Sequence, residues 1–154
     1  MRTDCFALFF SHNNKITSIV LSNVTAVGPY AFASNKNLTS VTLGALEKID
    51  EYAFFETGIT TLPAFNADTE IGKYAFAYTD ITSVTIPDKM VVAEGVFAEC
   101  GKLVTVVVGN DVVLGNFAFS TNKDECFTIK NYNEDGEKYF YYDFNTALKN
   151  VTIG

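Results

Sequence analysis

The chain has 154 residues, of which 48% are apolar and 19% are charged. This is enough for one folded unit with a continuous core, and two domains would be crowded. The formal net charge of −7 repels phosphate backbones and anionic lipid headgroups, which argues against nucleic acid and membrane surfaces as partners. No stretch approaches the roughly 20 apolar residues that a membrane span needs.

The first residues resemble a short secretory leader, because Arg2 precedes an apolar run from Phe6 to Phe10. The run ends at Ser11, which is short of the 7–15 residues expected of a leader core, and no small-residue cleavage site follows it. Export therefore cannot be read from this segment.

An aromatic residue then recurs at an almost constant interval, and we call it the anchor. The residue before it is small, and an aliphatic residue stands five positions before it. The intervals between successive anchors are 22, 22, 22, 21, 22 and 23 residues, for Phe10, Phe32, Phe54, Phe76, Phe97, Phe119 and Tyr142. A fixed period of this length is the signature of a repeat architecture.

The segments that follow each anchor have the pattern of half-buried strands. In residues 38–43, Val41 and Leu43 share one face while Ser40 and Thr42 share the other, which is an alternation of period two. The same phase is kept at the pairs Ile19/Leu21, Val84/Ile86, Val106/Val108 and Val151/Ile153. Each strand is expected to lead through a turn into a short helical, 3₁₀ or irregular return segment that carries the anchor.

One strand and one return segment cannot bury both of their faces, so each repeat must stack on its neighbours. The stack predicts an α/β-type repeat solenoid with one strand per repeat in a parallel sheet, the strands about 4.8 Å apart. The anchors are expected to form an internal ladder. We predict a single domain over residues 1–154 with about seven repeats.

The segment IGKYAFAYTDITSVTIP, residues 71–87, resembles the BspA-like leucine-rich repeat, whose pattern is Ile-Gly-x-x-Ala-Phe-x-x-Cys-x-x-Leu-x-x-Val-x-Ile-Pro. Cys100 stands at the cysteine position, which other repeats fill with Asn35, Thr57, Thr79 or Asn122. The resemblance covers nearly the whole chain. It implies a right-handed solenoid of a cell-surface or extracellular protein linked to adhesion and host-protein binding, with no catalytic residues and no cofactor.

The last repeat departs from the pattern between Phe119 and Tyr142. Asp135-Gly136 stands between two β-prone runs, which is a strong hairpin signal. We therefore predict a β-hairpin insertion over residues 127–142, which projects from the stack or covers its end.

The predicted concave strand face is the first candidate binding surface. Its side chains are short and almost uncharged, so the backbone of a partner protein or a glycan could approach closely; the alternative is an ordinary exposed sheet of soluble residues. The face comprises Ser18, Val20, Ser40, Thr42, Thr61, Pro63, Ser83, Thr85, Thr105, Val107, Thr128 and Lys130.

The aromatic residues of the predicted hairpin are the second candidate, with Tyr132, Tyr139 and Tyr141 as possible contacts. Tyrosine offers a large contact area with a polar tip. The alternative is that these rings cap the open end of the solenoid.

No set of residues predicts catalysis or a metal site. Cys5, Cys100 and Cys126 show neither CxxC nor metal-ligand spacing, and we expect buried, reduced thiols. A clustered nucleophile and base are missing as well. The sequence thus predicts a non-catalytic interaction or adhesion module, or alternatively a spacer of a larger surface protein. Because open solenoid ends can pair, end-to-end self-association is a further expectation.

Overall fold

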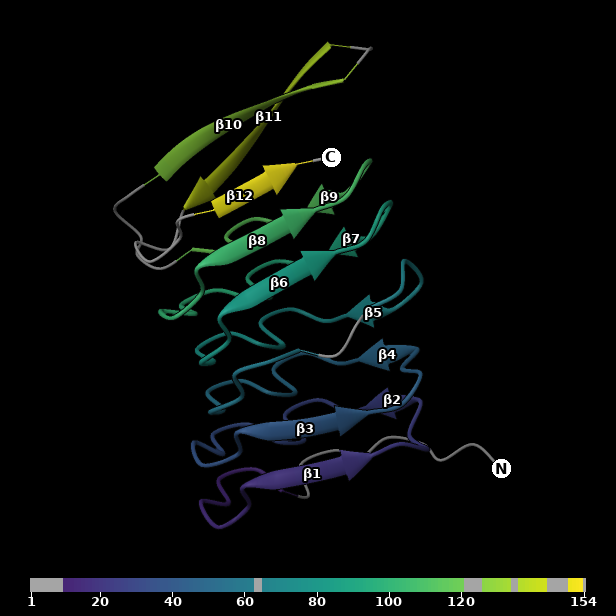
Figure 1. Ribbon diagram of the computed structural model, residues 1–154, viewed down its shortest axis with the longest axis vertical. Helices are drawn as coiled ribbons and strands as arrows, with labels where there is room; N and C mark the ends of the chain where they lie inside the picture. The colour runs from purple at the N-terminus through teal and green to yellow at the C-terminus, as the bar shows by residue number, and fades with distance from the viewer. Residues whose placement is uncertain (1–9, 63–64, 121–125, 134–135, 144–149, 154) are drawn as a thin grey trace.

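The computed structural model describes residues 10–62, 65–120, 126–133, 136–143 and 150–153, the last three ranges as backbone. The chain winds upward in coils of similar shape, each coil lying on the previous one (Figure 1). The segments of one repeat therefore contact the matching segments of the next repeat, as the 22-residue period predicts.

One strand per coil forms the face that we call the front sheet. Its strands are β1 (Ser18–Leu21), β3 (Ser40–Leu43), β6 (Ser83–Ile86), β8 (Thr105–Val108) and β12 (Asn150–Ile153). All pairings are parallel, in the orders β1-β3 and β6-β8-β12. Exposure alternates along β3 and β6, with Ser and Thr outward and the aliphatic residues inward, which confirms the predicted phase.

A second row of strands follows at the aliphatic positions before the anchors. These two-residue strands are β2 (Ala26–Val27), β4 (Lys48–Ile49), β5 (Glu70–Ile71), β7 (Val91–Val92) and β9 (Val113–Leu114). They pair in parallel as β2-β4-β5 and β7-β9. The sequence pattern predicts one strand per repeat, and this second row is an addition that the pattern does not indicate.

The return segments form a third side, which we call the turn wall: residues 28–35, 50–57, 72–79, 94–100 and 116–120. They consist of turns, and the described part of the chain contains no α- or 3₁₀-helix, so the irregular form of the return is the one adopted. In each coil the residues two before and two after the anchor have left-handed backbone angles, as at Tyr52 (φ 57°) and Glu56 (φ 57°). These angles let alternate amides point at the next coil.

Hydrogen bonds across the turn wall repeat in every described coil. The amides of Tyr52, Phe54 and Glu56 donate to carbonyl oxygens of the following coil at 3.0, 2.8 and 2.9 Å. Backbone groups that a turn would otherwise leave unpaired are thereby satisfied without a helix.

The anchors form the core. Phe32, Phe54, Phe76 and Phe97 are almost completely buried, and neighbouring rings stack with centroids 5.3–5.9 Å apart. The small residues before them are fully buried against the adjacent coils: Ala31, Ala53, Ala75, Val96 and Ala118. The expected internal ladder is confirmed.

The third coil interrupts the front sheet. No strand is formed at residues 60–62, so β3 pairs only with β1, and β6 pairs only with β8. Pro63, which the sequence analysis placed on the strand face, lies outside the described residues, as does residue 64. A proline has no amide hydrogen to donate to a ladder, so its residue type disfavours a strand at this place.

The two long strands β10 (Cys126–Asn133) and β11 (Gly136–Asp143) pair with each other in antiparallel register, from Cys126 opposite Asp143 to Asn133 opposite Gly136. This is where the sequence predicts a hairpin. Thr128 and Lys130 therefore lie in the hairpin and not in the front sheet, contrary to their predicted place on the strand face. The position next to β8 is taken by β12 instead.

Candidate functional site

The outer surface of the front sheet, which we call the front face, carries the predicted binding residues in register. Ser40, Thr42, Ser83 and Thr85 are exposed, and Thr105 is half-buried. Parallel pairing places Ser83 beside Thr105 and Thr85 beside Val107. Thr61 is also exposed, but it belongs to the third coil, where the strand is missing. The structure thus brings these residues together in two blocks.

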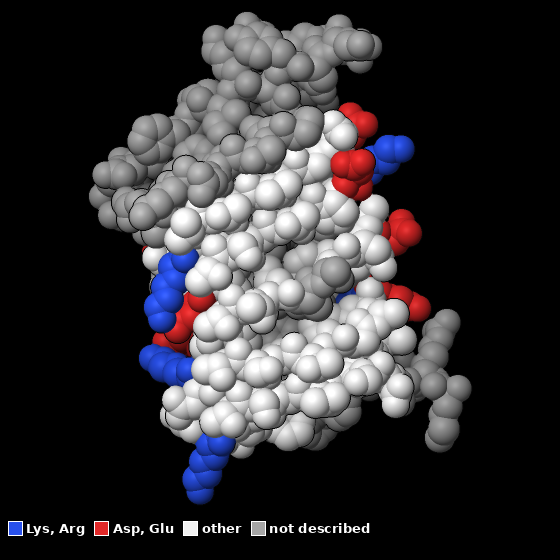
Figure 2. Space-filling model, viewed as in Figure 1, with Lys and Arg blue, Asp and Glu red and all other residues white. Residues whose placement is uncertain are grey.

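Charged side chains lie along the margins of this view and not across the front face (Figure 2). Two ion pairs join neighbouring coils in the segments that precede the strands, Lys36 with Glu56 and Lys102 with Asp80, both at 2.9 Å. At the other end of the strands, the Asp88 carboxylate accepts a hydrogen bond from the Asn110 amide at 2.8 Å. The front face is therefore neutral and flanked by charge.

The hairpin register pairs Tyr132 with Glu137, Tyr139 with Lys130 and Tyr141 with Thr128. The structure describes these residues through their backbone, and a contribution of their side chains to binding stays a prediction.

The turn wall carries an aromatic cluster that the sequence analysis missed. Tyr30, Tyr52 and Tyr74 stand two residues before successive anchors, and their rings stack with centroids 4.9 and 5.3 Å apart. Phe55 packs edge-on against Tyr52 at 5.5 Å and against Tyr78 at 5.2 Å. These five residues are called the aromatic cluster below. Their signal was the recurrence of tyrosine at an interval of 22 residues, which the stronger phenylalanine signal beside it obscured.

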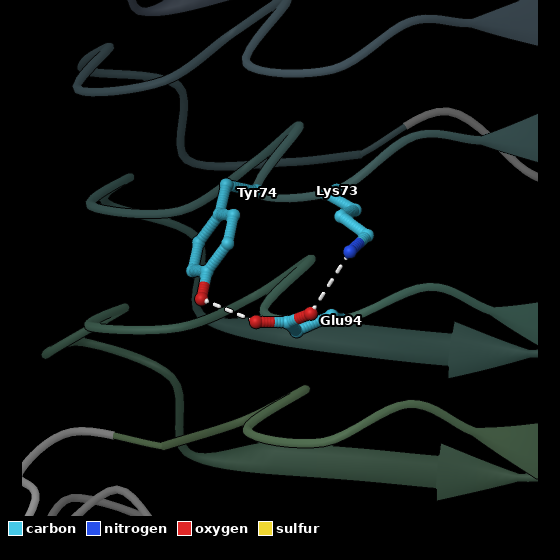
Figure 3. Close-up of polar contacts among 3 residues, drawn as sticks. All are labelled: Lys73, Tyr74 and Glu94. Atoms are coloured by element: carbon cyan, nitrogen blue, oxygen red, sulfur yellow. Dashed lines mark hydrogen bonds and ion pairs between the residues drawn. The ribbon is translucent and has the colours of Figure 1, made fainter.

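Glu94 ties the end of the tyrosine stack to the next coil (Figure 3). Its carboxylate accepts hydrogen bonds from the Tyr74 hydroxyl and from the Lys73 ammonium group, both at 3.0 Å. The hydrogen bond from Lys73, followed by that from Tyr74, lowers the pKa of Glu94. Burial and the contact with Glu94 raise the pKa of Tyr74.

Glu56, which stands two residues after the anchor Phe54, is also tied to the preceding coil. It accepts a hydrogen bond from the Ser34 hydroxyl at 2.9 Å and pairs with Lys36, and the contacts with Lys36 and then Ser34 lower its pKa. Glu99 has no ion pair within the described residues, and its partial burial raises its pKa. The turn wall therefore holds carboxylates with lowered pKa values, Glu56 and Glu94, and one with a raised pKa, Glu99.

The cysteine position of the repeat is a buried polar ladder. Thr57 and Thr79 donate to the carbonyl oxygens of Phe54 and Phe76 at 2.9 and 2.8 Å, and the Cys100 thiol lies 3.2 Å from the Phe76 oxygen. Cys100 is fully buried, as expected, and burial raises its pKa to about 11, which keeps the thiol protonated at neutral pH. The side chains of Cys5 and Cys126 lie outside the described residues.

Among the described residues, no three His, Cys, Asp or Glu side chains gather closely enough to hold a metal ion. No helix in that part of the chain is long and apolar enough to cross a membrane.

Comparison with known proteins bears directly on the repeat. The family model of the BspA type leucine rich repeat region matches residues 5–68 and 69–154, with six copies of the repeat. The anchor spacing predicts about seven repeats; the structure has a hairpin, β10 and β11, in the interval before the last anchor.

No curated protein matches the chain. Among solved structures, a leucine-rich repeat protein from Bacteroides ovatus aligns with a TM-score of 0.48 and 17% sequence identity, over 90% of this chain and 43% of that protein. The chain therefore spans less than half the length of that protein. The phased repeat, the stacked coils and the match over both halves of the chain lead to one assignment: the chain belongs to the BspA-type leucine-rich repeat family.

Proposed function

We propose that the chain is a non-catalytic binding module of a cell-surface or extracellular protein, which engages a partner protein or a glycan through its front face and its Tyr-rich hairpin. The repeat family supports an interaction module in general. The observation that carries the finer proposal is the neutral front face, where short hydroxyl side chains are exposed on β1, β3 and β6 and where Ser18 and Ser40 are register partners.

Such a face suits close approach by another backbone or by a sugar ring. Ser and Thr lose little side-chain entropy on binding because their side chains are short, and each hydroxyl both donates and accepts a hydrogen bond. The flanking charges keep the margins hydrated, which leaves the centre of the face as the least costly area to desolvate.

The proposal is tested by probing arrays of immobilised glycans and extracellular proteins with the chain and with a double variant, Thr42→Lys with Thr85→Lys. Both positions are exposed, so we expect the variant to fold normally and to lose the array signal, because two long cations then cover the face. Val113→Lys is the matched control, since Val113 is 52% exposed in β9 and lies outside the front sheet. The proposal fails if the double variant retains the signal of the unmodified chain.

The hairpin is tested separately. Replacing Tyr139 and Tyr141 with Ala is expected to weaken the captured partner while leaving the melting temperature nearly unchanged. A large fall in melting temperature would instead show that these residues cap the stack.

A structural spacer is the second candidate, and the regular hydrogen bonding between coils favours it. A spacer holds another domain at a distance and needs no ligand. Arrays that give no signal with the unmodified chain would support it. End-to-end self-association through the outermost coils is a further part of this proposal, and sedimentation over a range of concentrations tests it.

A further inference from the structure

We propose that the aromatic cluster and the carboxylates of the turn wall form a second interaction surface, which fits an arginine-rich segment of a partner protein. This surface is separate from the front face: the two are built by different segments of each coil, on either side of the same hydrophobic core.

The rings are accessible and held in place. Tyr78 is 52% exposed and Tyr30 is 39% exposed, while Tyr52, Phe55 and Tyr74 are half-buried and link them through the ring contacts described above. Because the rings already pack on one another, a partner that binds them need not immobilise five free side chains. Preorganised tyrosines of this kind are enriched at the energetic centres of protein interfaces.

The charge of the turn wall selects the sign of the partner. Its described residues include five carboxylates and a single cation, Lys73. Three of the carboxylates have ion pairs with lysines, and two do not take part in any ion pair of the described residues, namely Glu51 and Glu99. A cationic partner would find both aromatic rings and carboxylates on one wall.

Glu51 and Glu99 lie in coils next to exposed rings of the aromatic cluster. Glu56 and Glu99 occupy the coil position of Tyr78 in the preceding and following coils. The backbone hydrogen bonds show this, because the Glu56 amide donates to the Ala77 carbonyl oxygen and the Tyr78 amide donates to the Ala98 carbonyl oxygen. Glu51 lies next to Tyr30 across the coils, since the Tyr30 amide donates to the Glu51 carbonyl oxygen at 3.1 Å. A cation placed over Tyr78 or Tyr30 would thus also meet a carboxylate.

Arginine fits this combination better than other side chains. Its planar guanidinium stacks on aromatic rings and bonds carboxylates through two parallel donors, whereas a lysine ammonium group acts as a point charge. An apolar or acidic segment would instead desolvate or repel Glu51 and Glu99.

The test is calorimetric titration of the whole chain with a synthetic peptide of six arginines separated by glycines. Peptides with lysine or with glutamate in place of arginine are the comparison. We expect the arginine peptide to bind most tightly, the lysine peptide more weakly, and the glutamate peptide not at all. Equal affinity for the arginine and lysine peptides would show attraction to net charge alone and would overturn the proposal.

Variants locate the binding surface. Tyr78→Asn should weaken the arginine peptide about two- to fivefold through the lost cation–π contact, and asparagine tolerates the left-handed angle of this position (φ 59°). Val20→Asn introduces the same residue on the front face, at a site that is 71% exposed, and should have no effect.

The carboxylates are tested by the pair Glu51→Gln with Glu99→Gln, which should also weaken binding. Asp68→Asn with Asp111→Asn removes the same charge at exposed positions outside the turn wall and should change the affinity less. The proposal is overturned if both pairs act equally, or if Tyr78→Asn binds like the unmodified chain. Because the front-face variants Thr42→Lys and Thr85→Lys are read on different ligands, either proposal can fail alone.

Discussion

Tyr52 holds a backbone conformation that residues with a side chain normally avoid, with φ at 57°. The same is true of Tyr30 and Tyr74, whereas the matching residue in the next coil is Gly95 (φ 64°). A β-carbon at Gly95 would lie 2.2 Å from the Tyr74 ring, so a larger residue there would require this ring to move. The tyrosine amides donate to the following coil at these angles, and the ring contacts offset part of the cost of the left-handed conformation.

This balance predicts an unusual order of stability at residue 52. Tyr52→Gly should be more stable than Tyr52→Ala by about 1 kcal/mol, because both lose the ring contacts but only alanine keeps the penalty of the left-handed angle. Urea unfolding measures the difference.

The same two replacements at Val113, an exposed position in a strand, should show the opposite order, since glycine weakens strands relative to alanine. An alanine variant at residue 52 as stable as the glycine variant would contradict the account.

The anchors predict a larger effect. Phe76→Ala should destabilise the chain by about 3–5 kcal/mol, because the ring is buried between two other rings and its removal leaves a cavity. Urea unfolding of Val91→Ala, an exposed residue in β7, provides the control and should differ from the unmodified chain by less than about 0.5 kcal/mol.

At the scale of elements, the interrupted third coil makes β6 and β8 unequal. β8 has a partner strand on each side, while β6 lacks one on the side of the third coil. In the β6-β8 pair, the Thr105 amide donates to the carbonyl oxygen of Thr82 and the Gly109 amide to that of Ile86. Because alternate amides of a strand point the same way, the Val107 amide also points toward β6. The corresponding amide in β6 is that of Thr85. It points toward the third coil, where residues 60–62 form no strand.

Hydrogen exchange should therefore separate the two strands. We expect the amide of Thr85 to exchange at least about tenfold faster than that of Val107, because exchange follows the local loss of backbone hydrogen bonds. Similar protection of the two amides would show that the third coil closes the sheet in solution.

These elements show what the sequence could and could not predict. The front strands were predictable because their faces alternate over four residues, as in residues 40–43, and the hairpin because Asp135-Gly136 separates two β-prone runs. The second strand row was not, since two residues cannot display a period. The place of Pro63 on the strand face stays a prediction, because the residue lies outside the described part of the chain. The aromatic cluster escaped because only packing brings its rings from separate coils together.

At the scale of the whole molecule, ion pairs between coils couple stability to pH. The pKa values of Glu56 and Glu94 are lowered from their ordinary value of 4.5 by hydrogen bonds from the preceding coil. The donors are Lys36 and Ser34 for Glu56, and Lys73 and Tyr74 for Glu94. Their ionised forms stabilise the fold; this contribution is complete above pH 4.5 and is lost as the pH falls through the lowered folded-state values. The stack should therefore weaken in acid.

Glu56→Gln with Glu94→Gln should make the loss of stability below pH 4.5 shallower, as measured by thermal unfolding at a series of pH values. Glu99→Gln should act at higher pH. The pKa of Glu99 is raised above 4.5, so its protonation stabilises the fold as the pH falls toward 4.5, and this variant should lack that gain. Parallel pH profiles for all three proteins would contradict this assignment.

The pairing of β12 with β8 has a consequence for how such a chain can change. Thr105 and Asn150 are register partners, although about two repeat lengths separate them, and the intervening strands β10 and β11 pair only with each other. A strand can therefore extend the front sheet when it has the repeat pattern, even if it does not directly follow the previous repeat in the sequence. Replacing the segment that contains β10 and β11 with another sequence would change the surface offered to a partner and would leave the pairing of β8 with β12 intact.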